Sequence, residues 1–306
     1  MATESKKNPW KQGGELGEGY SLLTMALDQT EDASTGLKIE ALNRAATLAQ
    51  QRGDFGAAVS LAGSALELLD QSDDPARRLL VLENTAALAT DAGDYALAER
   101  HPAASLELAR ELEDEIEIAR ASYNLGLVAQ RQVHPQQALP LIATAYEIAE
   151  RLGNVPGQCF CLNTLGRIRR EGGEPLPACE LLGKALVLVA QTGHDLLAAS
   201  SLEELATCAL ELGDFDTGAR LMVTALDLRE RHGSVSTPGD MALTGETKVA
   251  LEQASDSAAA ILHGSSPLPL SECVELGRQL LVRSPASEIG PQLLAATEHW
   301  HLPPQG

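Results

Sequence analysis

Aromatic residues are scarce in this sequence. They make up 3% of its 306 residues, although 44% of the residues are hydrophobic. Globular enzymes usually fill their cores with larger side chains, whereas thin helices can interlock through alanine and leucine. The shortage of aromatic residues therefore favours stacked helices over a compact enzyme core.

Basic residues are also few. The chain has 23 Lys and Arg against 43 Asp and Glu, a net charge of −20. A surface that binds nucleic acid needs clustered Lys and Arg to displace counterions, so we expect no direct nucleic acid binding. One stretch departs from this balance, because residues 119–190 hold seven Lys or Arg and five Asp or Glu. The middle of the chain is a basic island in an acidic protein.

Several functional motifs are missing. The sequence has no apolar signal region and no apolar run of transmembrane length, so we expect a cytoplasmic protein that binds no membrane. Its five cysteines form no CxxC motif or Cys/His cluster, which predicts buried free thiols, no metal and no cofactor. It also lacks a nucleophile elbow and a phosphate-binding loop. We therefore expect no enzyme; an enzyme site in the C-terminal region is the remote alternative.

A turn returns every forty residues. Its copies are Gly53-Asp54-Phe55, Gly93-Asp94-Tyr95, Val133-His134-Pro135, Gly173-Glu174-Pro175 and Gly213-Asp214-Phe215. Glycine can adopt the left-handed conformation that ends a helix, and the following Asp can cap the next helix. The spacing predicts a series of hairpins, each with two helices joined by this turn.

Small residues repeat with the same period at three places. These are Ala46, Ala86, Gly126, Gly166 and Ala206 before the turn, then Ala58, Ala98, Ala138, Ala178 and Gly218, and finally Ala65, Ser105, Ala145, Ala185 and Ala225. Small side chains let helices cross closely. The pattern predicts an all-α, right-handed α-solenoid of helical hairpins with a C-terminal helical cap.

The period also predicts the domain boundaries. Residues 1–38 form a flexible N-terminus and a truncated first repeat, in which residues 20–28 read as a second helix without its partner. Residues 39–238 form five repeats. The period fails after Gly233, so residues 239–306 are expected to form a helical cap and a loose tail. The uncovered apolar side of the helix at 20–28 predicts self-association.

One repeat breaks the pattern. His101-Pro102 falls where the other second helices carry apolar pairs such as Leu61-Ala62. Proline inside a helix removes a backbone hydrogen bond and costs about 3 kcal/mol. We expect either a kink or a late start of this helix.

The repeat resembles the tetratricopeptide (TPR) pattern W-x2-L-G-x2-Y followed by A-x3-F. Matching positions are Ser122, Leu125, Gly126 and Ala129 with Ala138 and Ile142, and Leu162, Leu165, Gly166 and Arg169 with Ala178 and Leu182. The period is forty rather than thirty-four, and the proline that often closes the unit is absent. The resemblance implies TPR-type hairpins whose first helices line a concave groove.

More narrowly, the chain resembles the C-terminal half of bacterial ATP-dependent (STAND) transcriptional regulators of the LuxR and AfsR type. The segments that carry this resemblance are residues 10–27, 41–46, 202–221 and 263–274. In that family the superhelix senses a ligand or partner. The resemblance implies a sensor or scaffold in a bacterial transcriptional regulatory system. Neither ATP hydrolysis nor DNA binding carries over, since the phosphate loop and a helix-turn-helix are missing.

The repeat register gives the residues that would face the groove. The third repeat presents Arg120, Tyr123, Asn124 and Leu127, the fourth presents Phe160, Asn163, Arg167 and Arg170, and Asn43 and Asn84 extend a line of amides toward the N-terminus. Asparagine can hold a peptide backbone, and arginine can grip a carboxylate with two hydrogen bonds.

We therefore expect this groove to bind a protein or peptide partner, with an acidic or C-terminal segment or a small anion between repeats 3 and 4. In the alternative interpretation, the arginines pair with Glu171 and Glu174 on a solvated surface, and the asparagines bond between adjacent helices. A further alternative is a small-molecule or signal-peptide receptor that closes on its ligand.

Overall fold

The protein is all-α throughout the part of the chain that the structure describes. The computed structural model describes residues 14–29, 33–69, 74–232 and 238–283, so the predicted loose ends at 1–13 and beyond 283 lie outside it. The chain divides into two compact units. Unit 1 comprises residues 1–132 and 232–238, and unit 2 comprises residues 133–231 and 239–306.

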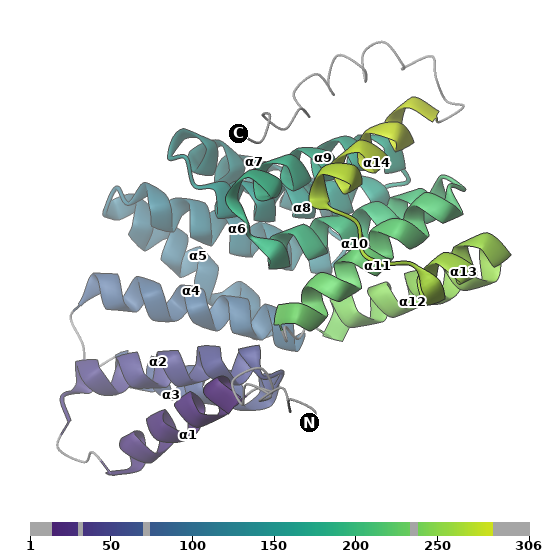
Figure 1. The fold of residues 1–306 in the computed structure, drawn as a ribbon. Helices are drawn as coiled ribbons and strands as arrows, with labels where there is room; N and C mark the ends of the chain where they lie inside the picture. The colour runs from purple at the N-terminus through teal and green to yellow at the C-terminus, as the bar shows by residue number, and fades with distance from the viewer. Residues whose placement is uncertain (1–13, 30–32, 70–73, 233–237, 284–306) are drawn as a thin grey trace, which may run out of the picture. The chain divides into compact units, whose positions relative to one another are not determined.

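Six helices form unit 1. They are α1 (Gly14–Gln29), α2 (Thr35–Gln51), α3 (Phe55–Leu69), α4 (Pro75–Ala92), α5 (Tyr95–Glu111) and α6 (Glu115–Arg131). Each helix packs on the next, and α4 also packs on α2 and α6 (Figure 1). Contact between successive first helices is the expected arrangement of stacked TPR-type hairpins.

Unit 2 holds the remaining eight described helices. They are α7 (Pro135–Arg151), α8 (Val155–Glu171), α9 (Pro175–Thr192), α10 (Asp195–Glu211), α11 (Phe215–His232), α12 (Pro238–Ala254), α13 (Asp256–Gly264) and α14 (Leu270–Arg283). Helix α8 packs on α7, α9 and α10, and α14 lies against α9 and α10.

The period of forty is exact in the helix starts. First helices begin at Thr35, Pro75, Glu115, Val155 and Asp195, and second helices at Phe55, Tyr95, Pro135, Pro175 and Phe215. Turn glycines such as Gly53, Gly173 and Gly213 have φ between 78° and 79°. The predicted hairpins and glycine turns are therefore confirmed.

Capping side chains fix where the helices begin. Asp54, Asp94 and Asp214 each accept a hydrogen bond from the backbone N–H three residues later, as predicted. His134 and Glu174 make no such bond, and each is followed by a proline at the first helical position. That proline has no N–H to satisfy, so the missing cap leaves fewer backbone donors unpaired.

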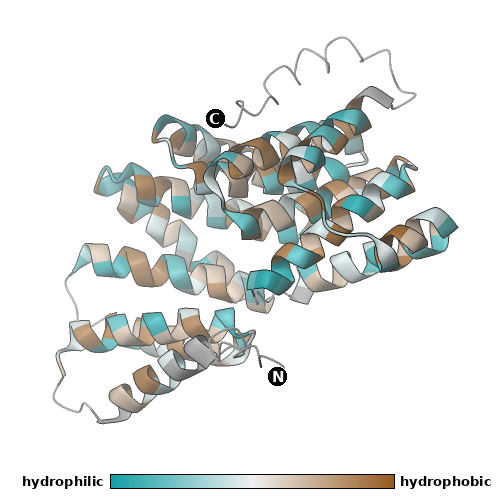
Figure 2. Ribbon diagram, viewed as in Figure 1, coloured by the Kyte–Doolittle hydropathy of each residue, from teal (hydrophilic) through white to brown (hydrophobic). Residues whose placement is uncertain are grey.

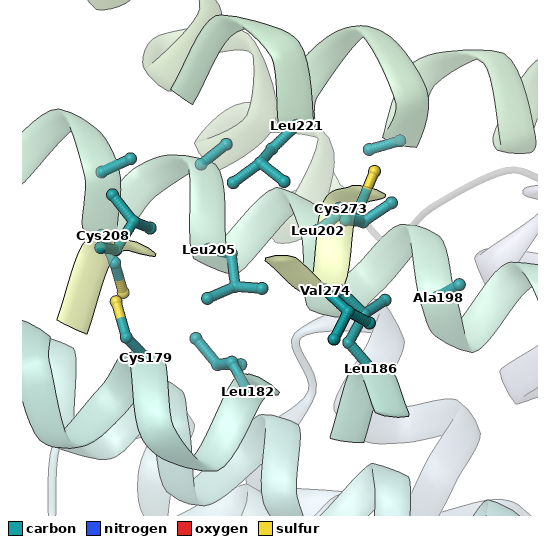
Figure 3. Packing of buried hydrophobic residues seen from close by; sticks show 14 of the residues in the cluster. Cys179, Leu182, Leu186, Ala198, Leu202, Leu205, Cys208, Leu221, Cys273 and Val274 are labelled. Atoms are coloured by element: carbon teal, nitrogen blue, oxygen red, sulfur yellow. The ribbon is translucent and has the colours of Figure 1, made fainter. Parts of the chain in front are cut away.

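Interlocking small residues and leucines form the core, as the sequence predicts. The alanines, serine and glycines of the three repeating registers are buried. In unit 2, Leu182 and Leu186 of α9 pack with Leu202 and Leu205 of α10, and Cys273 of α14 joins the same cluster (Figure 3). Along the helices, brown hydrophobic and teal hydrophilic residues alternate (Figure 2), which is typical of helices buried on one side.

One local prediction needs correction. Helix α5 runs from Tyr95 to Glu111 with Pro102 inside it, so the late helix start is wrong, while a kink stays a prediction. Neighbouring turns and buried contacts hold α5 in place despite the lost hydrogen bond, as they do for α7 with its internal Pro140.

Helices α12 and α13 lie in the segment expected to form the C-terminal helical cap. Thr247 of α12 shares a 3.0 Å hydrogen bond with Thr207 of α10, forty residues earlier. Ser257 of α13 donates a hydrogen bond to Asp216 of α11, forty-one residues earlier. Ser255, and not a Gly-Asp pair, caps α13.

Candidate functional site

In unit 1 the predicted line of amides bonds between neighbouring first helices. The side chain of Asn84 on α4 donates a 2.6 Å hydrogen bond to Oδ1 of Asn43 on α2. Asn124 on α6 donates a 2.7 Å hydrogen bond to Oε2 of Glu83, next to Asn84 on α4. Asn43 and Asn124 are buried. These amides therefore stabilise the stack of first helices, as the alternative interpretation expects.

The other three predicted residues of α6 lie closer to solvent. Arg120 is exposed and pairs with Glu117 one turn earlier, at 3.0 Å. Tyr123 and Leu127 are half-buried. Of the four predicted α6 residues, Arg120 is the one whose charge faces solvent.

In unit 2 the four predicted residues of α8 share one side of the helix. Phe160 is 47% exposed, while Asn163 is half-buried and its Oδ1 accepts a 2.8 Å hydrogen bond from Ser201 on α10. Arg167 and Arg170 follow on the same side and are more deeply buried. This side of α8 thus carries an exposed aromatic ring near the start of the helix and two arginines near its end.

The two arginines are held by carboxylates of other helices. Nε of Arg167 lies 2.6 Å from Oε1 of Glu204 on α10, and Nη1 lies 2.9 Å from Oδ1 of Asp240 on α12. Arg170 contacts the second oxygen of Glu204 at 3.1 Å and also Glu211 at 3.1 Å.

These partners differ from the ones that the sequence suggests. Glu171 lies 4.0 Å from Arg170, and Glu174 pairs with Arg169 instead. Arg167 and Arg170 therefore form a buried ion-pair network with α10 and α12, and not the solvated surface pairs of the alternative interpretation.

A third arginine completes this network. Arg229 on α11 donates two hydrogen bonds of 2.7 Å to the carboxylate of Glu203 on α10. Burial lowers the pKa of Arg167, but the carboxylates of Glu204 and Asp240 raise it well above its ordinary value. Burial likewise lowers the pKa of Arg229, but the effects of Glu203 and Asp240 raise it by more. The arginines therefore stay charged, and electrostatic attraction holds α8, α10, α11 and α12 together.

Sequence reasoning missed the carboxylate half of the network. Glu203 and Glu204 stand one period after Asn163 and Thr164, so the repeat register does contain a signal for them. Asp240 follows the linker, where that register is interrupted, and no sequence signal points to it. The α6 residues lie in unit 1 and the α8 residues in unit 2, so a joint site remains a proposal.

The cysteines are buried free thiols, as predicted. Burial raises the pKa of Cys159 and Cys273 to about 11, and burial raises that of Cys161 to about 12, so these thiols are protonated at neutral pH. The sulfur atoms of Cys179 and Cys208 face each other between α9 and α10 (Figure 3). A protonated, buried thiol is a poor nucleophile, which does not favour catalysis by these residues.

Among the described residues, no group of three or more His, Cys, Asp or Glu side chains could hold a metal ion. Within the same part of the chain, each helix is too short or too polar to cross a membrane.

Comparisons with known proteins identify the fold. No family model matches the chain, and no curated protein matches it. A solved Rap protein complexed with competence and sporulation factor matches with a TM-score of 0.63 and 12% identity, over 98% of this chain and 88% of that one. The fold is a TPR-like helical repeat.

Two other structures match over most of their length. The apo form of RapI gives a TM-score of 0.56 and 15% identity, over 80% of this chain and 93% of that one. BtubC (BKLC) from P. vanneervenii gives a TM-score of 0.49 and 18% identity, over 86% of this chain and 96% of that one. At these identities the two Rap matches show the shared fold and nothing finer.

Proposed function

We propose that this protein is a non-enzymatic regulatory module that binds a protein or peptide partner. Stacked TPR-like hairpins offer the side of their first helices as an extended binding surface. The Rap protein of similar fold was solved with competence and sporulation factor bound, which supports a binding role. The resemblance to LuxR and AfsR-type regulators adds a bacterial transcriptional regulatory system, in the cytoplasm, as the setting.

The exposed ring of Phe160 is the observation that carries this proposal. It is 47% exposed, and it is the aromatic one among the exposed large hydrophobic residues of the described chain, in a sequence with 3% aromatic residues. Exposed aromatic residues are common anchors in interfaces, particularly beside polar groups that fix orientation. Asn163 lies one turn further along the same side of α8 and supplies such a group.

An acidic partner fits the local charge. Residues 119–190 carry a small positive excess in a chain with a net charge of −20. In unit 1, Arg120 is exposed beside Glu117. An exposed positive charge in an acidic protein attracts a negatively charged segment, which the acidic surface elsewhere repels.

The partner is tested by affinity purification followed by mass spectrometry, and then by calorimetry with the purified partner. Phe160→Ala is expected to weaken binding about tenfold or more, because truncating a central aromatic anchor typically costs over 1 kcal/mol. Leu152→Ala is the matched control, since Leu152 is a similarly exposed apolar residue at the end of α7. Equal loss with both variants, or no loss with Phe160→Ala, would contradict the proposal.

The identity of the partner tests the setting. An ATPase or a DNA-binding regulator would support transcriptional control, whereas an unrelated enzyme would favour a scaffold. In either case, the wild type must enrich the partner more than the Phe160→Ala variant does.

Self-association through α1 is a second part of the proposal. Tyr20 packs on the cluster formed by α2 and α3, but Leu22 and Met25 of α1 are exposed. Exposed apolar residues that lie one turn apart on a helix favour contact with a second copy. We expect Leu22→Glu with Met25→Glu to lower the association measured by sedimentation equilibrium, and an unchanged mass would refute this part.

A further inference from the structure

The carboxylate of Asp240 reaches across a whole repeat. Asp240 lies in the first turn of α12, and its Oδ1 is 2.9 Å from Nη1 of Arg167 on α8. Helix α10 contributes Glu204 to the same guanidinium. The contact therefore ties together first helices that are not consecutive in the stack.

One arginine contacts Asp240, and a second arginine belongs to the same network. Arg167 on α8 and Arg229 on α11 each keep 16% of their side chain exposed. Asp240 raises the pKa of both guanidinium groups, after the larger effects of burial and of Glu204 or Glu203. A buried arginine that pairs with a carboxylate is a contact that proteins also use to bind a carboxylate from a ligand.

The other carboxylates of the network are fixed in place. Glu204 is 3% exposed and uses each oxygen on a different arginine, while both oxygens of Glu203 bind Arg229. Asp240 is 23% exposed and stands next to the exposed Met241. Of the two carboxylates on Arg167, Asp240 is the one that can be replaced from solvent.

We propose that Arg167 forms a binding site for a carboxylate of an acidic partner segment, and that Asp240 occupies this site until the partner displaces it. The inference rests on the proposed function and adds the chemistry of the partner and an autoinhibitory contact. An incoming Asp, Glu or C-terminal carboxylate restores the ion pair that Asp240 leaves. Displacement thus leaves no buried arginine unpaired, and it frees the start of α12.

Competition between Asp240 and the carboxylate of a partner should change the binding affinity by a measurable factor. A group attached by a short segment acts at an effective concentration in the millimolar range. The apparent affinity for the partner equals the intrinsic affinity multiplied by the fraction of molecules in which Asp240 has left the site. We expect removal of Asp240 to tighten binding of an acidic peptide about tenfold or more.

Chemical rescue tests the site without any partner. In Asp240→Ala, acetate should enter the vacated position and raise the melting temperature in a saturable way, relative to chloride at equal ionic strength. The wild type should show no such rise. Glu211→Ala is the matched control, because Glu211 pairs with Arg170 and does not contact Arg167. Equal effects of acetate and chloride on Asp240→Ala would overturn the inference.

A binding assay tests the competition. The probe is a fluorescein-labelled hexaglutamate peptide, with hexaglutamine as its uncharged counterpart, followed by fluorescence anisotropy. Asp240→Asn, which keeps the shape of the side chain, should bind hexaglutamate about tenfold tighter than the wild type, and Glu211→Gln should not. Adding Arg167→Lys to Asp240→Asn should remove the gain, because lysine cannot form the two-pronged contact.

The two proposals can fail separately. A partner that depends on Phe160 but binds the wild type and Asp240→Asn equally overturns the role of Asp240 and leaves the proposed function intact. Acetate rescue together with tighter hexaglutamate binding supports the carboxylate site even if no partner depends on Phe160, and in that case the proposed function falls.

Discussion

Asn124 on α6 donates a 2.7 Å hydrogen bond to the carboxylate of Glu83 on α4, and both side chains are buried. Ser105 of α5 is buried near this pair. Among the described residues, Oγ of Ser105 and Oε1 of Glu83 have no hydrogen-bond partner. Burial raises the pKa of Glu83 from 4.5 to about 7, and the hydrogen bond from Asn124 opposes this rise. Glu117 raises it further, and Arg120 lowers it.

The raised pKa of Glu83 predicts that stability falls as the pH rises. Between pH 4.5 and about 7 the folded chain keeps a proton that the unfolded chain has lost. The stabilisation is fully present below pH 4.5 and is lost as the pH passes about 7, a change of about 3 kcal/mol.

The test replaces the acid by its neutral amide. Glu83→Gln should raise the free energy of unfolding at pH 8 and remove this part of the pH dependence, measured by urea denaturation from pH 4 to 8. Glu107→Gln makes the same change at an exposed position of α5 and should alter neither quantity much. A variant Glu83→Gln that is less stable than the wild type at pH 8 would contradict the account.

Val133 is expected to strain its turn. It stands where the other turns of the series have glycine, and its φ is 62°. A residue with a side chain pays roughly 1–2 kcal/mol in this left-handed region, and a β-branched one is a clear outlier. Val133→Gly should therefore raise the free energy of unfolding by about 1 kcal/mol, after the greater freedom of glycine in the unfolded chain is subtracted.

The reverse change provides the control. Gly173 has φ 79°, and a Cβ added there would meet nothing within 4 Å. Gly173→Val should therefore destabilise through the backbone alone, by about 1–2 kcal/mol in thermal denaturation. If Val133→Gly lowered the free energy of unfolding, the valine side chain would make a contact that outweighs the strain, and the prediction would be wrong.

Gly166 marks a close crossing of α8 and α9. A Cβ at this position would lie 2.7 Å from Cγ of Leu182. Gly166→Ala should lower the free energy of unfolding by about 1–3 kcal/mol, since a packed leucine must move. Gly63→Ala should do the opposite by about 0.5–1 kcal/mol, because Gly63 lies inside α3 with open space around it. Equal signs for the two changes in chemical denaturation would refute this packing argument.

The buried and exposed ion pairs should differ in their contribution to stability. Glu204→Gln removes the shared partner of Arg167 and Arg170, and breaking a buried pair from one side typically costs about 3–5 kcal/mol. Glu174→Gln breaks the half-exposed pair with Arg169, for which about 0–1 kcal/mol is expected. Urea denaturation of both variants at low and high salt gives the comparison, and a similar small loss in both would show that the network contributes little.

The sequence predicted the repeat architecture because that information is local and periodic. Small residues such as Ala46 and Ala58 recur with the turn at intervals of forty, and each sits where two helices cross. Caps such as Asp54 and Asp94 act on backbone groups three residues away. Such short-range rules need no knowledge of the tertiary structure, so the helix starts follow from them directly.

The pairing of the polar side chains was decided by the tertiary structure. The sequence placed Arg167 and Asn163 on one side of α8, but it could not show that Glu204 and Asp240 would pair with the arginine. Those partners lie far along the chain, and nearby Glu171 and Glu174 are equally good acids. Only the stacking of α8, α10 and α12 brings one set within ion-pair distance, because the energy of an ion pair depends on separation and burial, not on residue type alone.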